Sequence, residues 1–79
     1  MNEIGMRLQN LREAKQPVLS RKKTAELIGL HPDMIRRYER GETKPSADAL
    51  ILLANYYQVT SDYILGLENF QKTHKSGNF

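Results

Sequence analysis

Apolar residues recur at intervals of three and four along most of the chain, which is the spacing of a helix with one buried face. Prolines, glycines and small polar residues interrupt this pattern repeatedly. The pattern predicts helices over five segments, namely residues 2–15, 21–28, 32–40, 47–57 and 61–65. The sequence therefore predicts a compact all-α domain over residues 1–67, followed by a mobile polar tail over residues 68–79.

The residues that flank these segments favour the same boundaries. Four segments are preceded by a residue that can accept a hydrogen bond from a free backbone N–H group, namely Ser20, His31, Ser46 and Thr60. Glycine, which readily adopts the left-handed conformation that ends a helix, follows three of them, at positions 29, 41 and 66. The link between the second and third segments is so short that we expect these two helices to cross steeply, as in a helix-turn-helix motif.

The segment 32–40 has two chemically different sides. Ile35 and Tyr38 lie on one side, whereas the opposite side carries Asp33, Arg36, Arg37 and Arg40. Pro32 suits the first position of a helix, where its missing N–H group breaks no hydrogen bond. Because the planar guanidinium group pairs well with phosphate and with the guanine edge in the major groove, this side is interpreted as a surface that recognises DNA.

The helical spacing also predicts which residues form the core. On this basis the core should contain Ile4, Leu8, Leu11, Ala25, Ile28, Leu50, Leu53, Ala54, Tyr57, Ile64 and Leu65. Three further apolar residues of the segment 47–57 remain, Ile51, Leu52 and Tyr56. They either fill a central position in the core or form a surface for a partner, and the pattern does not choose between these alternatives.

Charge is distributed unevenly along the chain, although the net charge is only +3. Residues 20–40 hold six basic and three acidic side chains, whereas residues 45–66 hold two acidic side chains and no basic ones. An anionic partner is therefore expected at the middle third of the chain. The first turn of the segment 21–28 contains Arg21, Lys22 and Lys23, which oppose the helix dipole by roughly a few tenths of a kcal/mol each. A ligand of opposite charge would explain them; the alternative is a solvated basic turn.

Composition excludes several classes of function. The 79 residues include no cysteine, so neither disulfide bonds nor thiolate-bound metal can support the fold. The two histidines are far apart and no nucleophile, base and acid occur at a suitable spacing, so we expect no metal site, no cofactor and no enzymatic activity. The longest apolar run, residues 49–54, is too short to span a membrane, and the N-terminus lacks a secretory signal. A cytoplasmic location is expected.

With these elements in place, residues 4–66 resemble the Cro/C1-type (XRE-like) helix-turn-helix domains of phage repressors and bacterial regulators. The resemblance rests on IGMRLQNLR in the first segment, on LSRKKTAELIGL followed by HPDMIRRYERG, and on KPSADALILLANYYQVTSDYILG. It implies a five-helix fold like that of lambda repressor and binding to double-stranded DNA.

The resemblance also implies roles for individual residues. Base contacts in the family correspond here to Pro32, Asp33, Arg36 and Arg37, and phosphate contacts correspond to Ser20, Arg21, Arg40 and Lys44. Lys22 and His31 are added as candidate DNA contacts because they lie in the same turns. The sequence departs from the family at Arg21, where glutamine is frequent, at Pro32, which offers no side-chain hydrogen bond, at Thr24, where leucine is frequent, and in the longer turn around Pro17.

A buried ion pair is a further feature that the resemblance implies, here between Arg12 and Glu39. The helical spacing agrees, because Glu39 follows Ile35 by four residues and Arg12 follows Leu8 by four. Each charge would be costly to bury without the other. The alternative is that both side chains are exposed.

Two functions are compatible with these features. The first is a sequence-specific DNA-binding regulator, a repressor, which acts as a homodimer on a palindromic operator. Its dimer contacts would come from Ile51, Tyr56, Tyr63 and Leu67. The second is an antitoxin or adaptor with the same fold, which binds a partner protein through the C-terminal tail. Deletion of the residues after Leu67 would abolish the function of the adaptor and leave DNA binding by the regulator intact.

Overall fold

The computed structural model describes residues 3–67, and they form five α-helices without a β-strand. The helices are α1 (Glu3–Glu13), α2 (Arg21–Ile28), α3 (Pro32–Arg40), α4 (Ala47–Tyr57) and α5 (Ser61–Leu65). The predicted all-α fold class is confirmed. α1 ends two residues before the predicted end at Lys15, because Pro17 lacks an N–H group and disfavours helical geometry in the residue before it.

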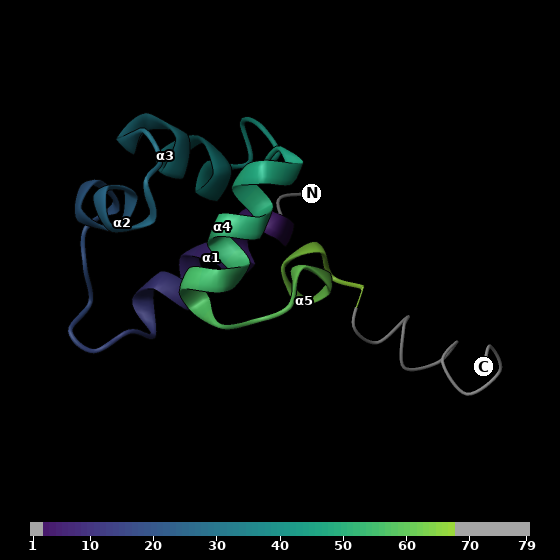
Figure 1. The fold of residues 1–79 in the computed structure, drawn as a ribbon, viewed down its shortest axis with the longest axis horizontal. Helices are drawn as coiled ribbons and strands as arrows, with labels where there is room; N and C mark the ends of the chain where they lie inside the picture. The colour runs from purple at the N-terminus through teal and green to yellow at the C-terminus, as the bar shows by residue number, and fades with distance from the viewer. Residues whose placement is uncertain (1–2, 68–79) are drawn as a thin grey trace, which may run out of the picture.

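The helices are arranged so that α3 lies against both α1 and α2, while α5 closes the other end of the molecule against α1 and α4. Figure 1 shows α2 nearly end-on and α3 running across the view, so the two helices cross steeply, as predicted from the short link between them. α4 passes in front of α1 in the same view. The result is that α2 and α3 lie together at one end of the molecule, far from α5.

Side chains cap four of the five helices at their N-termini. The hydroxyl groups of Ser20, Ser46 and Thr60 accept hydrogen bonds from backbone N–H groups in the first turns of α2, α4 and α5 at 3.0, 3.1 and 3.0 Å. His31 uses its Nδ1 atom in the same way, accepting from the N–H of Asp33 at 3.1 Å. Each such cap contributes about 1 kcal/mol, so the predicted boundaries are reinforced locally before any tertiary packing.

The core is formed by ten buried apolar residues, listed here in chain order: Leu8, Ala25, Ile28, Ile35, Tyr38, Ala49, Leu53, Ala54, Tyr57 and Ile64. The prediction for Leu65 is wrong, because this side chain is 36% exposed whereas its neighbour Ile64 is fully buried. Consecutive residues on a helix point about 100° apart, so a one-turn helix cannot direct both at the same centre. On α4 Leu53, Ala54 and Tyr57 are buried as predicted, but Ala49 is also buried and Leu50 lies only at the edge of the core.

The three surplus apolar residues of α4 have different environments. Ile51 and Leu52 are exposed, at 57% and 39%, whereas Tyr56 is half-buried and packs against the core. The ammonium group of Lys15 lies 4.5 Å from the centre of the Tyr56 ring, close enough for a cation–π interaction. The apolar surface left over on α4 is therefore formed by Ile51 and Leu52, and not by Tyr56.

Thr24, which stands where leucine is frequent in the family, is 1% exposed in the core. Its hydroxyl oxygen has no hydrogen-bond partner among the described residues. A buried hydroxyl group without a partner costs about 1–3 kcal/mol relative to one that is paired. Thr24 is thus a weak point in an otherwise apolar interior.

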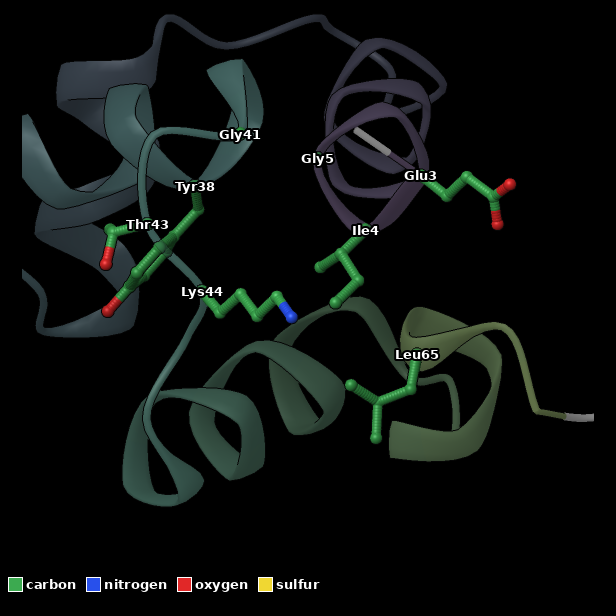
Figure 2. A pocket seen from close by; sticks show the side chains of 8 residues that line it. All are labelled: Glu3, Ile4, Gly5, Tyr38, Gly41, Thr43, Lys44 and Leu65. Carbon is green, nitrogen blue, oxygen red and sulfur yellow. The ribbon is translucent and has the colours of Figure 1, made fainter. Parts of the chain in front are cut away.

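Lys44 lies in the loop between α3 and α4, and its side chain turns toward the N-terminal end of α1. It helps to line a hollow of about 360 Å³ between α1, this loop and α5. Figure 2 shows its amino group close to Ile4, with Leu65 on the far side of the hollow and Tyr38 beside the loop.

Two expectations concern the chain as a whole. The tail predicted for residues 68–79 lies outside the described residues. Between residues 3 and 67, no helix is both long enough and apolar enough to cross a membrane.

Candidate nucleic-acid interface

The two sides of α3 face opposite environments. Ile35, Tyr38 and Glu39 are buried against the rest of the molecule, at 2%, 4% and 3% exposure. Arg37 and Arg40 point outward, with 49% and 60% of their side chains exposed. This division follows from the helical period and makes the outer side of α3 a rigid, cationic surface.

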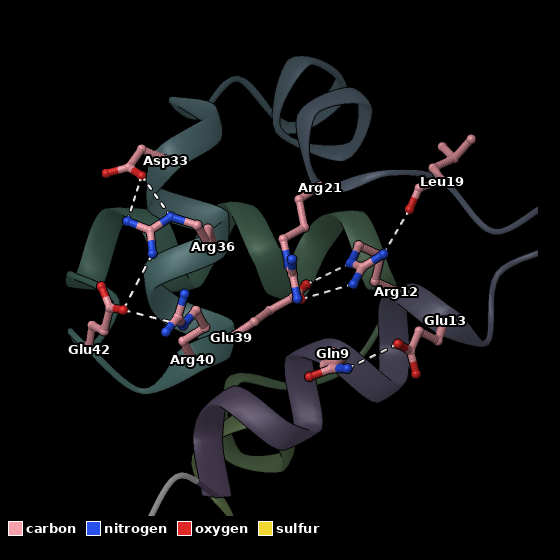
Figure 3. Close-up of polar contacts among 10 residues, drawn as sticks. All are labelled: Gln9, Arg12, Glu13, Leu19, Arg21, Asp33, Arg36, Glu39, Arg40 and Glu42. Carbon is pink, nitrogen blue, oxygen red and sulfur yellow. Dashed lines mark hydrogen bonds and ion pairs between the residues drawn. The ribbon is translucent and has the colours of Figure 1, made fainter.

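Arg36 connects the beginning of this surface to its end (Figure 3). Its Nε and Nη2 atoms lie 2.9 and 2.8 Å from one carboxylate oxygen of Asp33, in the first turn of α3. Its Nη1 atom donates to Glu42, just beyond the helix, at 3.3 Å. All three guanidinium nitrogens of Arg36 therefore contact carboxylates of the protein itself.

The same two carboxylates each contact a second arginine. The other oxygen of Asp33 lies 3.2 Å from Nε of Arg37, and Glu42 lies 3.3 Å from Nε of Arg40. We call these five residues, Asp33, Arg36, Arg37, Arg40 and Glu42, the surface arginine network. It holds three cations and two anions, a net charge of +1.

These contacts shift the pKa values of two groups in the surface arginine network, Asp33 and Arg36. The hydrogen bond from Arg36 lowers the pKa of the Asp33 carboxyl group, and the positive charges of Arg36 and Arg37 act in the same direction. The hydrogen bond to Asp33 in turn raises the pKa of Arg36. Both shifts favour the charged forms of Asp33 and Arg36.

A second cluster of charged residues lies in the interior, behind α3. The Nε and Nη2 atoms of Arg12 contact the two carboxylate oxygens of Glu39 at 2.7 and 3.0 Å, and its Nη1 atom donates to the carbonyl oxygen of Leu19 at 2.9 Å. Arg12 is 8% exposed and Glu39 is 3% exposed. The hydrogen bond to Glu39 raises the pKa of Arg12. The ion pair is thus buried and bidentate.

Arg21 joins this interior cluster, which sequence reasoning missed. Its Nε atom donates to Glu39 at 2.8 Å, and 40% of its side chain remains exposed at the start of α2. We call Arg12, Arg21 and Glu39 the buried charge cluster; it links α1, α2 and α3. Residue spacing gave no signal for this contact, because Arg21 and Glu39 are 18 residues apart and lie on different helices.

The other candidate DNA contacts fall into two groups. Ser20 caps α2, Lys22 is exposed in the first turn of that helix, and His31 is exposed at the start of α3. These residues lie at the same end of the molecule as the surface arginine network. Lys44 differs, because its amino group lies in the hollow near α1 and not beside the arginines.

The candidate dimer residues lie on α4, α5 and just after α5. Ile51, Tyr63 and Leu67 are exposed, at 57%, 39% and 42%. Tyr56 is packed against the core and beneath Lys15, and so is less available to a partner. In the described part of the chain, no group of three or more histidine and acidic side chains is placed to hold a metal ion.

Comparison with known proteins bears on the family of the chain. Residues 8–64 match a family described as helix-turn-helix. Three regulators from Bacillus subtilis (strain 168) are similar to the chain. The HTH-type transcriptional regulator ImmR is 32% identical over 69 residues, covering 86% of this chain and 54% of ImmR.

The uncharacterized HTH-type transcriptional regulator YobD is 43% identical over 61 residues, covering 77% of this chain and 53% of YobD. The HTH-type transcriptional regulator AnsR is 37% identical over 67 residues, covering 85% of this chain and 56% of AnsR. The matched region spans about half the length of these relatives. Among solved structures there is no significant match.

Proposed function

The chain belongs to the helix-turn-helix family of Cro/C1 type, and we propose that it is a sequence-specific transcriptional regulator that binds double-stranded DNA with α3 in the major groove. One observation carries this proposal. Ile35, Tyr38 and Glu39 fix the inner side of α3 in the interior, so the arginines on its outer side are held on a rigid helix at the surface. An α-helix of this kind fits the width of the major groove.

The proposed division of labour follows the position of each side chain. Arg37, in the second turn of α3, reads a base edge, for which the guanine O6 and N7 atoms are the best acceptors. Arg21, Lys22 and Arg40 contact phosphates on either side of the groove, together with the capped N-terminus of α2. Phosphate contacts supply affinity for any duplex, and base contacts supply selectivity.

Selection of duplexes from a random pool, followed by binding titrations with the 79-residue chain, tests the proposal. A preferred sequence should emerge, and the double substitution Arg37→Gln, Arg40→Gln should weaken its binding at least about tenfold, since two charged contacts are lost. Arg7→Gln is a control for the loss of a single positive charge outside α3, because Arg7 lies on α1 and pairs with Glu3 there at 3.7 Å. If the double variant and the control bind DNA equally well, the proposal fails.

We further propose that the regulator acts as a homodimer on a palindromic operator, because one short helix reads too few bases to be selective. Ile51, Tyr63 and Leu67 support this, since they expose apolar surface on α4, on α5 and just after α5, and residues 45–66 hold only two charged side chains. In sedimentation experiments Ile51→Asp should shift the chain toward monomer, whereas Leu27→Asp, at an equally exposed apolar position on α2, should not. A monomer at high concentration, both with and without operator DNA, would rule out the dimer.

Repression is the proposed sense of regulation, because occupancy of an operator is enough to block access to a promoter. A reporter gene under a promoter that contains the selected sequence should be less active when the chain is present. The Arg37→Ala variant should restore its activity. An increase in reporter activity with the intact chain would indicate activation instead.

A further inference from the structure

The arginines of the surface arginine network make more contacts with carboxylates than a surface that only attracts DNA would require. Arg36 contacts carboxylates with all three of its guanidinium nitrogens, and Arg37 and Arg40 each contact one through Nε. Two acids therefore lie among the three arginines, Asp33 on the side of α3 that would enter the groove and Glu42 just beyond the end of the helix. Each acid repels phosphate, so the network reduces the attraction of this surface for an arbitrary duplex.

Stability does not explain this arrangement. The side chains of the network are between 37% and 60% exposed, and ion pairs in such positions contribute little to the free energy of folding. Holding long arginine side chains in one geometry also costs conformational entropy. A role in binding accounts for both acids better than a role in folding.

We infer that Asp33 and Glu42 are specificity-determining residues, which hold the arginines of α3 and disfavour duplexes that cannot replace these contacts. The inference rests on the proposed function and extends it. An arginine leaves its carboxylate readily only where DNA presents acceptors in matching positions, as a guanine edge does for Arg37. A random duplex offers the same phosphates but poorly placed base edges, so repulsion from the acids is not offset there.

The two acids differ in how directly they can act. Asp33 is itself in the first turn of α3, where its carboxylate can accept a hydrogen bond from the cytosine amino group. Glu42 follows Gly41, beyond the end of the helix, and contacts Arg36 and Arg40 from outside α3. Glu42 is therefore the better residue to substitute, because its loss alters the arginines without removing a candidate base contact.

The test compares the intact chain with Glu42→Gln on two duplexes of equal length and composition, the selected sequence and a shuffled one. The variant should bind the shuffled duplex about three- to tenfold more tightly while its affinity for the selected duplex changes less, so that selectivity falls. Glu13→Gln provides the control. It removes an exposed carboxylate from α1, where its partner is Gln9, and should leave the ratio of the two affinities unchanged.

A second pair of variants separates the effect of the contacts with arginine from the effect of removing one negative charge. Asp33→Asn and Asp62→Asn remove the same group from the first turns of α3 and α5, so the loss of a favourable helix-dipole interaction is matched. Asp33→Asn should tighten binding to the shuffled duplex, which the loss of a base contact alone would not do, whereas Asp62→Asn should leave the ratio of the two affinities unchanged. If Glu42→Gln tightens binding to both duplexes by the same factor, or leaves both affinities unchanged, the inference is overturned. Selective binding by the intact chain would support the proposed function in either case, and an absence of selectivity in the intact chain would overturn both.

Discussion

The buried charge cluster and the surface arginine network use the same chemistry on opposite sides of one helix. In both, arginine nitrogens contact carboxylate oxygens at hydrogen-bonding distance, and in both, the cations outnumber the anions by one. They differ in exposure, because Glu39 is 3% exposed whereas about 40% of the Asp33 and Glu42 side chains is accessible. Burial makes the first cluster a fixed part of the fold, and exposure leaves the second free to exchange its contacts for DNA.

The difference shows that burial determines whether an ion pair between arginine and a carboxylate serves mainly folding or mainly binding. Water competes poorly for Glu39, so removal of one partner would strand a charge in the interior. Water and phosphate compete well for the acids at the surface, so their contacts shape the binding surface and add little to stability. The following predictions test this contrast, beginning with the largest effect.

Substitution of the shared buried acid should have the largest effect. Glu39→Gln removes the carboxylate that Arg12 and Arg21 share, and we expect the free energy of unfolding to fall by about 3–5 kcal/mol. Denaturation by urea measures it. Glu13→Gln, the same change at an exposed position, should shift the free energy by less than about 0.5 kcal/mol. Similar effects of the two substitutions would contradict the assignment of the buried charge cluster as structural.

Arg37→Ala should have the largest effect on recognition and little effect on folding. Loss of its base contact should relax selectivity at one base pair by about 1–3 kcal/mol. Titrations against a set of duplexes that differ from the selected sequence at single positions measure this. If binding to every duplex weakens by the same factor, Arg37 is a phosphate contact and not a base contact.

Arg21 belongs to the buried charge cluster and also reaches the surface, so its substitution should affect both properties. Arg21→Ala should weaken binding to all duplexes alike and reduce the slope of log affinity against log salt concentration by about 1. It should also lower the free energy of unfolding by about 1 kcal/mol, because Glu39 loses one donor. Lys22→Ala, in the same exposed turn, should reproduce the effect on binding without the effect on stability. Equal stability of both variants would separate Arg21 from the buried charge cluster.

The smallest effect is expected from the surface arginine network in the absence of DNA. The pKa of Asp33 lies below its ordinary value of 3.8 because of the hydrogen bond from Arg36, so Arg36→Gln should raise it, which nuclear magnetic resonance titration of the carboxyl group can measure. A lowered pKa in the folded state stabilises the protein at pH values above 3.8, and this contribution is lost as the pH falls through the folded-state pKa. The melting temperature near neutral pH should change by less than about 3 °C. A larger change would show that the network is structural.

Much of the fold could be predicted from short-range patterns. Ser20, His31, Ser46 and Thr60 mark helix starts because a side chain reaches a backbone group only two or three residues away. The two sides of α3 follow from the helical period in the same way. The ion pair between Arg12 and Glu39 was expected only because residue spacing agreed with a family resemblance.

What could not be predicted depends on packing between distant segments. Leu65 and Leu50 fit a core pattern, but the orientations of α5 and α4 expose the first and bury Ala49 in place of the second. The direction of the Lys44 side chain likewise depends on how its loop rests against α1.

By itself, the sequence determined five helices, the ends of all but the first, and a third helix with one apolar and one arginine-bearing side. Only the tertiary structure decided that Arg21 joins Arg12 at the carboxylate of Glu39. Arg21 and Glu39 are 18 residues apart, and Arg12 and Glu39 are 27 apart. Helical spacing governs contacts over three or four residues, whereas contacts over such distances exist only once three helices have packed together.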